Sequence, residues 1–125
     1  MEFLLVGIGG IFGSITRFSL GKFISKKLNS SFPFGTFIIN ITGAILLGIV
    51  TSIGSSKNLY ITLGDGFLGA YTTFSTFMYE GFNLFQGKSK LNAFAYILCS
   101  VVLGIIGYAI GEKLGLFLKL YNLIL

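Results

Sequence analysis

The stretch GAYTTFSTF, residues 69–77, lies within one of the most apolar regions of the chain and decides how that region folds. It combines a glycine, four serine and threonine hydroxyls, and two phenylalanines three positions apart. Gly66 and Gly69 weaken an α-helix, and the β-branched pair Thr72 and Thr73 follows. A break here frees backbone N–H and C=O groups, which an apolar medium tolerates only where protein, a cavity or an ion satisfies them. The stretch therefore predicts a helix that is interrupted at a site.

The composition around this stretch is that of a membrane protein. Of the 125 residues, 54% are hydrophobic and only 10% are charged, and the mean hydropathy is +0.88. A soluble domain has about a quarter of its residues charged, so the deficit indicates a lipid environment. The pI near 9.5 does not indicate a nucleic-acid partner, because the basic residues lie mainly between and at the ends of hydrophobic segments.

Four apolar segments are long enough to cross a bilayer, which takes about 20 helical residues. The loops between them are short, so consecutive helices are expected to be antiparallel neighbours within one domain, residues 1–125. The first segment follows Glu2 without a basic region and is expected to be an uncleaved span. Pro33 is a favourable start for the second. The sequence thus predicts an all-α membrane protein with four transmembrane helices, the third one broken: residues 3–24, 34–53, 59–85 and 93–120.

The lysines give only a modest indication of orientation. The first and third loops hold more of them than the opposite side does, so the positive-inside rule places these two loops in the cytoplasm and both termini outside. Because the bias is weak, a single fixed orientation and a mixture of two orientations both stay open. The lysines counted are Lys22, Lys26, Lys27, Lys88 and Lys90 on one side, and Lys57, Lys113 and Lys119 on the other.

Two glycine patterns favour close helix packing. Gly9 and Gly13 form a G-x-x-x-G pair in the first span, and a stripe of four glycines runs along the fourth span. Packing through small residues drives helix association in lipid, so we favour this interpretation over glycines that line a pore. The stripe consists of Gly104, Gly107, Gly111 and Gly115.

Polar residues inside the spans carry the chemistry, because such residues usually face protein or water. Arg17 lies near the far end of the first span, where it could either extend to the headgroups or set a positive charge at the mouth of an anion path. Asn40 and Thr36 share one face of the second span. An Asn amide there most often joins helices, and the alternative is a donor to an anion stripped of water.

Beyond the expected break, Phe74, Phe77 and Glu80 fall on one helix face. Phenyl rings have electropositive edges, although such spacing usually means a core or lipid-facing pair. With the nearby hydroxyls, these residues are typical of a path for a small, strongly hydrated anion. Four helices hardly enclose such a path alone. Two copies inserted in opposite directions would bring their broken helices together near the midplane, where a cation could satisfy freed carbonyls.

Three motifs resemble the Fluc family of fluoride channels (CrcB-like proteins) across essentially the whole chain. They are GGIFGSITRF (residues 9–18), GTFIINITGAILLG (35–48) and GFLGAYTTFSTFMYE (66–80). The resemblance implies an antiparallel, dual-topology dimer with two fluoride pathways and a central structural sodium ion, in the plasma membrane of a prokaryote. It also implies passive export: fluoride enters as neutral HF, ionises in the more alkaline cytoplasm, and leaves through the channel.

The same resemblance implies roles for individual residues. Main-chain carbonyls of Gly69 and Thr72 from both subunits would bind the sodium ion, and Arg17 would help hold the anion-attracting vestibule. The fourth helix departs from the family pattern at Gly104, where a further hydroxyl often lies, which affects the outer end of the polar track. The expected fluoride pathway comprises Asn40 as pore donor, Phe74 and Phe77 as ring-edge ligands, and Thr36, Ser75, Thr76, Glu80, Tyr96 and Ser100 along its length.

Other functions fit the residues less well. An enzyme is not expected, since the chain has no histidine, no cysteine pair and no paired carboxylates. A small proton-coupled four-helix exporter would need a membrane carboxylate in its first helix, which here has no acid beyond Glu2. A non-transporting assembly subunit would explain the glycine stripes but not Asn40, the broken helix and the phenylalanine pair together. Whether two identical chains suffice, or a homologous partner is needed, stays open.

Overall fold

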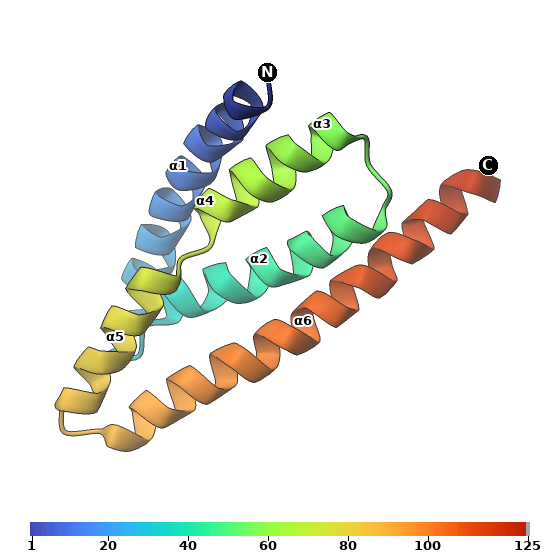
Figure 1. Cartoon of the computed structure of the whole chain (residues 1–125). Coiled ribbons are helices and arrows are strands. Elements are labelled where there is room, and N and C mark those ends of the chain that lie inside the picture. Colours follow the sequence, from blue (N-terminus) through green and yellow to red (C-terminus); the bar gives the residue numbers. More distant parts are fainter. Residues whose placement is uncertain (125) are drawn as a thin grey trace.

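A computed structural model describes residues 1–124 and contains only helices and their connections over that range (Figure 1). Three helices are long and apolar enough to cross a membrane. The region between the second and third of these is divided into shorter helical pieces. The chain is therefore a multi-pass membrane protein with a broken third helical region, as predicted. The long helices are α1 (Glu2–Leu28), α2 (Phe34–Ser52) and α6 (Lys90–Ile124); the pieces are α3 (Lys57–Tyr60), η1 (Ile61–Leu68), α4 (Gly69–Tyr71) and α5 (Phe74–Gln86).

The helices begin close to the predicted positions, but two of them end later. α1 continues through Lys26 and Lys27, which lie in its last turn, to Leu28. Lysines stabilise the negative end of the helix dipole there, so the helix continues beyond its apolar part. α6 starts earlier and ends later than the predicted 93–120. Pro33 lies at the N-cap of α2, as expected.

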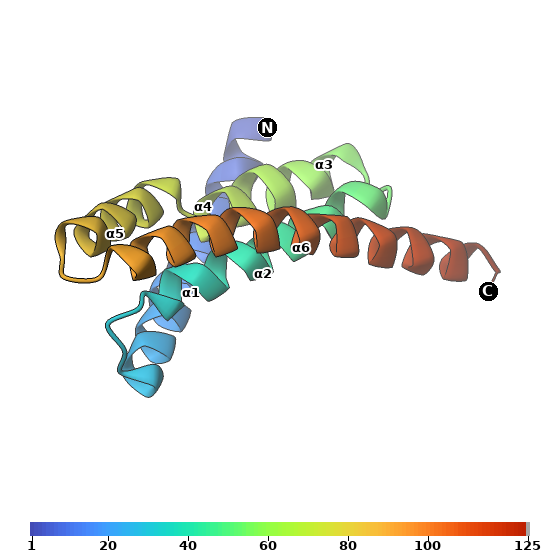
Figure 2. The same ribbon diagram turned by 90° about the horizontal axis from the view of Figure 1, so that it is seen from below.

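The helices pack as two layers that meet at the break. α2 lies along α6, whereas α1 packs against η1 and α4, and α5 packs against the first part of α6. In Figure 2, α1 crosses the direction of α6 steeply, and α6 extends well past the other helices toward the C-terminus. α1 also contacts α2 directly, so α4 packs against α1 and α2, whereas α5 packs against α2 and α6.

Glycines allow the closest of these contacts, which confirms the packing interpretation for most of them. A Cβ atom at Gly13 would collide with the Phe67 carbonyl of η1, and one at Gly111 would collide with the Ile45 carbonyl of α2. Gly104 is different, because a Cβ atom there would meet nothing within 4 Å. Including Gly104 in the packing stripe was therefore wrong.

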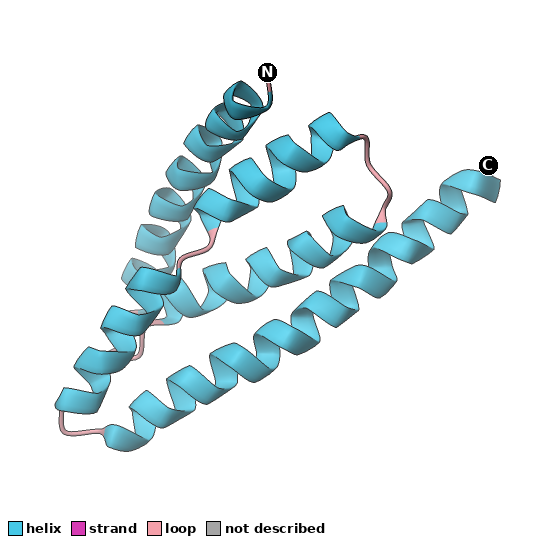
Figure 3. Cartoon of the chain, viewed as in Figure 1, coloured by secondary structure: helices cyan, strands magenta, loops and turns pink. Residues whose placement is uncertain are grey.

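The third helical region is interrupted after Tyr71, and the residues responsible are the threonines (Figure 3). Gly66 and Gly69 remain helical, and η1 is a π-helix, a wide turn that occurs often at functional sites. Thr72 (φ −78°, ψ 160°) and Thr73 (φ −147°, ψ 121°) adopt extended backbone before α5 begins. The break lies within the predicted region, at the threonine pair that was named together with Gly66 and Gly69.

Candidate functional site

The backbone of Thr73, in the middle of the break, is held by the side-chain amide of Asn40. Asn40 Nδ2 donates to the Thr73 carbonyl oxygen at 2.9 Å, and the Thr73 N–H donates to Asn40 Oδ1 at 2.8 Å. Asn40 thus acts as interhelical glue, the commoner of the two roles considered. An amide nitrogen carries two N–H groups, so one donor remains beside the cavity that Asn40 lines.

Two carbonyls that precede Thr73, those of Gly69 and Thr72, have lost their usual helical partners to side chains. In an unbroken helix, the Gly69 carbonyl would accept from the Thr73 N–H, but that group donates to Asn40. The Thr72 carbonyl would accept from the Thr76 N–H, which instead donates to Thr73 Oγ1 at 3.3 Å. Both residues line the same cavity. Over residues 1–124, no cluster of three His, Cys, Asp or Glu side chains could hold a metal ion.

Arg17 points into the protein at the level of the break. Its Nη1 donates to the Thr72 carbonyl oxygen at 3.4 Å. Because α1 continues to Leu28, Arg17 is further from the helix end than predicted. Extension of this side chain to the headgroups is therefore not its role in this structure, and its positive charge lies beside a freed carbonyl.

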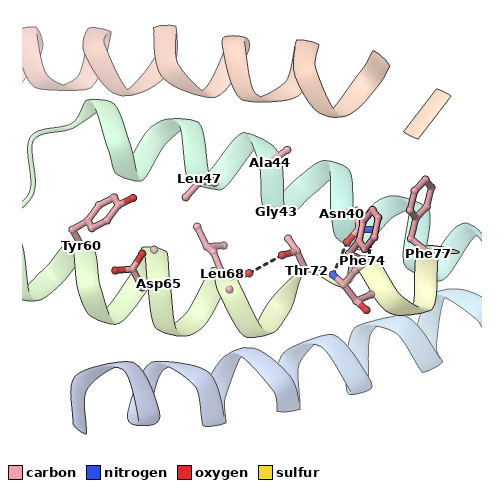
Figure 4. Close-up of a pocket in the computed structure, with 13 residues that line it drawn as sticks. Asn40, Gly43, Ala44, Leu47, Tyr60, Asp65, Leu68, Thr72, Phe74 and Phe77 are labelled. Carbon is pink, nitrogen blue, oxygen red and sulfur yellow. Dashed lines mark hydrogen bonds between the residues drawn. The ribbon is translucent and has the colours of Figure 1, made fainter. Parts of the chain in front are cut away.

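A cavity of about 590 Å³ opens along the third helical region (Figure 4). Asn40, Phe74 and Phe77 gather at one end of it, whereas Tyr60 and Asp65 lie at the other. The rings of Phe74 and Phe77 are 6.1 Å apart between centroids. Phe77 is 8% exposed, but Phe74 is 76% exposed within this single chain.

The polar residues predicted on three different spans meet at Glu80. Its Oε1 accepts from Thr36 Oγ1 at 3.0 Å, and its Oε2 accepts from Tyr96 OH at 2.9 Å. Tyr96 is fully buried, and its ring lies 5.2 Å from that of Phe77. The phenylalanine pair and the carboxylate are therefore linked through Tyr96.

A second cavity, of about 330 Å³, lies on the other side of Thr73. Arg17 and Lys22 supply two positive charges to it, and Thr36 and Thr76 supply hydroxyls. Thr76 Oγ1 accepts from Thr73 Oγ1 at 3.1 Å. Glu80 also borders this cavity, so the carboxylate and both basic side chains share one polar space.

Two predicted site residues stand apart from this arrangement. Ser75 is exposed on the first turn of α5 and borders none of these cavities. Ser100 follows Tyr96 by one turn on α6, and its buried Oγ has no hydrogen-bond partner among the described residues. A buried hydroxyl without a partner is costly, so Ser100 is a position where a solute could take a hydrogen bond.

Tyr60 and Asp65 were not predicted from the sequence. Asp65 is a carboxylic acid in an apolar helical region, which is by itself a sign of a functional site. It also precedes Gly69 by four residues, the spacing of neighbours on a helix face. Asp65 was not included among the polar residues of the spans, so this signal was not used.

Comparison with known proteins agrees with this picture. The family model described as CrcB-like protein, Camphor Resistance (CrcB), matches residues 4–112. A Clostridium acetobutylicum protein named fluoride-specific ion channel FluC 2 is 64% identical over 112 residues, covering 90% of this chain and 96% of that relative. A Bacillus cereus protein of the same name is 45% identical over 92% of this chain and 98% of its own length. The Dehalococcoides mccartyi fluoride-specific ion channel FluC is 42% identical over 94% and 95%. This chain therefore belongs to the CrcB-like protein family.

Proposed function

We propose that this chain forms a fluoride channel that lets F⁻ leave the cytoplasm passively and so relieves fluoride toxicity. The names of its relatives support this function, and so does the site. The observation that carries the proposal is the broken helix, whose freed backbone lies beside a phenylalanine pair and a row of hydroxyls. These groups carry no catalytic chemistry, but together they can replace the water around a small anion.

The donors along the path are weak and spread over several residues. An anion at the break would meet the second Asn40 N–H and the positive edges of Phe74 and Phe77. Beyond them lie the hydroxyls of Thr36 and Tyr96, which Glu80 holds in this structure. A halide and the carboxylate compete for the same two donors, so the ion is bound loosely enough to leave. Ser75, Thr76 and Ser100 would extend the row of hydroxyls.

The functional unit in this proposal is an antiparallel dimer of two such chains, or of this chain and a homologous subunit. The mostly exposed ring of Phe74 and the carboxylate of Asp65 border a cavity with freed carbonyls. A carboxylate and freed carbonyls do not usually face lipid. A second subunit over the cavity would cover them and complete the wall of the path.

The carbonyls of Gly69 and Thr72 fit a sodium ion, because both have lost their helical partners and both line the cavity. A bound sodium ion would supply positive charge to freed carbonyl oxygens of both subunits. Arg17 competes for one of these oxygens, so its side chain would hold the Thr72 carbonyl when the ion is absent.

The direct test is to reconstitute the chain alone in liposomes and record fluoride efflux with an electrode under a potassium–valinomycin clamp. We expect efflux driven by the fluoride gradient and voltage, as for a channel of the prokaryotic plasma membrane. A small proton-coupled exporter would instead require a pH gradient. No efflux from assembled protein, alone or with a homologous subunit, would contradict the channel function.

A further inference from the structure

Glu80 separates two cavities, and only one of them belongs to the path described above. On the far side of the carboxylate, a third cavity of about 510 Å³ lies where the first and third loops approach each other. Pro33 and Gly87 mark these two connections. Both lie at the same end of the molecule, where α5 and α6 join in Figure 1. A path that passes Glu80 would reach water there.

The lining of this third cavity suits an anion. Asn83 and Asn92 contribute side-chain amides, and Ser30, Ser31 and Ser89 contribute hydroxyls. Lys88 brings the positive charge, and the other charged residue that borders the cavity is Glu80. Both oxygens of Glu80 accept hydrogen bonds from Thr36 and Tyr96, and Glu80 and Lys88 form no ion pair among the described residues.

The neighbouring lysine serves as an internal comparison. Lys90 lies two positions further along but does not border the cavity. Its ammonium group lies 5.5 Å from the centre of the Phe85 ring, in a cation–π contact. Lys88 and Lys90 are therefore alike in charge and close along the chain, and they differ in whether the charge faces the cavity.

We propose that this third cavity is a water-facing mouth of the anion path, and that Lys88 concentrates small monovalent anions in it. The proposal rests on the proposed channel function. It adds an entry site to that function and a charge that raises the rate of anion entry. Charges at a narrow opening raise the local concentration of counter-ions and hence the rate of entry. The effect is strong at low ionic strength and screened at high salt.

The test changes only the charge at one position after the protein has folded. The parent is the Cys99→Ser variant, into which Lys88→Cys or Lys90→Cys is introduced. After reconstitution, methanethiosulfonate reagents attach a sulfonate, a trimethylammonium or a methyl group to the new thiol. Initial fluoride efflux is then recorded at about 0.01 M and about 1 M of an impermeant salt, where charges are screened over about 30 Å and about 3 Å.

At low salt, we expect the trimethylammonium form at position 88 to carry fluoride about threefold faster than the sulfonate form. The methyl form should lie between them, and the difference should vanish at high salt. The three forms at position 90 should differ much less than those at position 88, because that side chain does not border the cavity. Equal rates for the three forms at position 88, or equal effects at both positions, would contradict the role of the third cavity as a mouth. The channel function would be unaffected by that result. A parent protein without fluoride efflux would contradict both the channel function and the proposed mouth.

Discussion

At the scale of single residues, the amide of Asn40 takes the place of a backbone neighbour for Thr73. It accepts from the N–H and donates to the carbonyl of the same residue. The sequence left two roles open for Asn40, glue between helices or donor to an anion. The geometry supports the first directly and leaves one N–H for the second.

Replacing Asn40 with aspartate should abolish fluoride efflux. The new carboxylate would keep an acceptor for the Thr73 N–H, but it would lose both donors and bring a potential negative charge to the path. The unsatisfied Thr73 carbonyl should also lower the free energy of unfolding by about 1–3 kcal/mol. Efflux and thermal unfolding should be measured on the same reconstituted protein. Asn58→Asp, an exposed position at the start of α3, should change neither; normal efflux in Asn40→Asp would exclude Asn40 from the path.

The two phenylalanines should respond differently to replacement by isoleucine. Both variants should lose most of the fluoride efflux, because each removes a ring edge. Phe77→Ile should also reduce the thermal stability of the chain itself, since Phe77 is buried against Tyr96 within one chain, whereas Phe74 is mostly exposed there. Phe85→Ile, which lies outside the site against Phe94, is the control. If both test variants carried fluoride at the rate of the parent protein, the ring edges would not be ligands of the anion.

Residue types could be predicted more readily than their contacts. Thr36 and Glu80 stood out as polar groups in apolar spans, and the resemblance added Tyr96, but their meeting joins three helices that one sequence cannot position. Asp65 was missed because its significance depends on the cavity it borders. The side-chain position of Ser75 offers no support yet, and its role stays a prediction.

At the scale of elements, the third helical region shows why its interruption was predictable but its exact position was not. Glycines lower helix stability, yet Gly66 packs tightly against α1 and stays helical. The chain opens instead at Thr72 and Thr73, where Arg17 and Asn40 can satisfy the backbone. Where several residues weaken a helix to a similar degree, the tertiary contacts available at each residue therefore determine where the helix breaks.

The packing of α2 on α6 gives a matched pair of variants. Gly111→Val should lower the free energy of unfolding by about 1–3 kcal/mol, because the new side chain collides with the Ile45 carbonyl. Gly104→Val, in open space on the same helix, should be neutral or slightly stabilising, since valine is a better helix former than glycine. Unfolding in detergent by heat or denaturant compares the two directly. Equal destabilisation would mean that α2 and α6 do not pack as described.

At the scale of the whole molecule, one chain leaves the candidate site open on one side. The cavity beside the break has freed carbonyls, an exposed ring and a carboxylate along one face. Family resemblance supplied the antiparallel dimer and the sodium ion, and the weak lysine bias was compatible with it. Neither follows from the residues of a single chain, because the second subunit is needed to complete both.

Sodium should stabilise the assembled protein if the carbonyls of Gly69 and Thr72 hold it. Binding to the folded dimer alone adds about 2.7 kcal/mol at a hundredfold excess over the dissociation constant. Thermal unfolding in detergent should therefore occur at higher temperature in sodium chloride than in choline chloride of equal concentration. Choline is too large for a site made of carbonyls, so it controls for ionic strength. The same unfolding temperature in both salts would argue against the ion.

Opposite orientation of the two subunits predicts an unusual labelling result. Asn58 and Gln86 lie exposed at opposite ends of the third helical region, so in a single orientation only one of them faces the outside. In a Cys99→Ser background, an impermeant maleimide applied to intact cells should label about half of the molecules at either Asn58→Cys or Gln86→Cys, as a weak lysine bias permits. Permeabilisation should raise both to completion. Full labelling at one position and none at the other would show a fixed orientation, in which case an opposite-facing homologous subunit would have to complete the path.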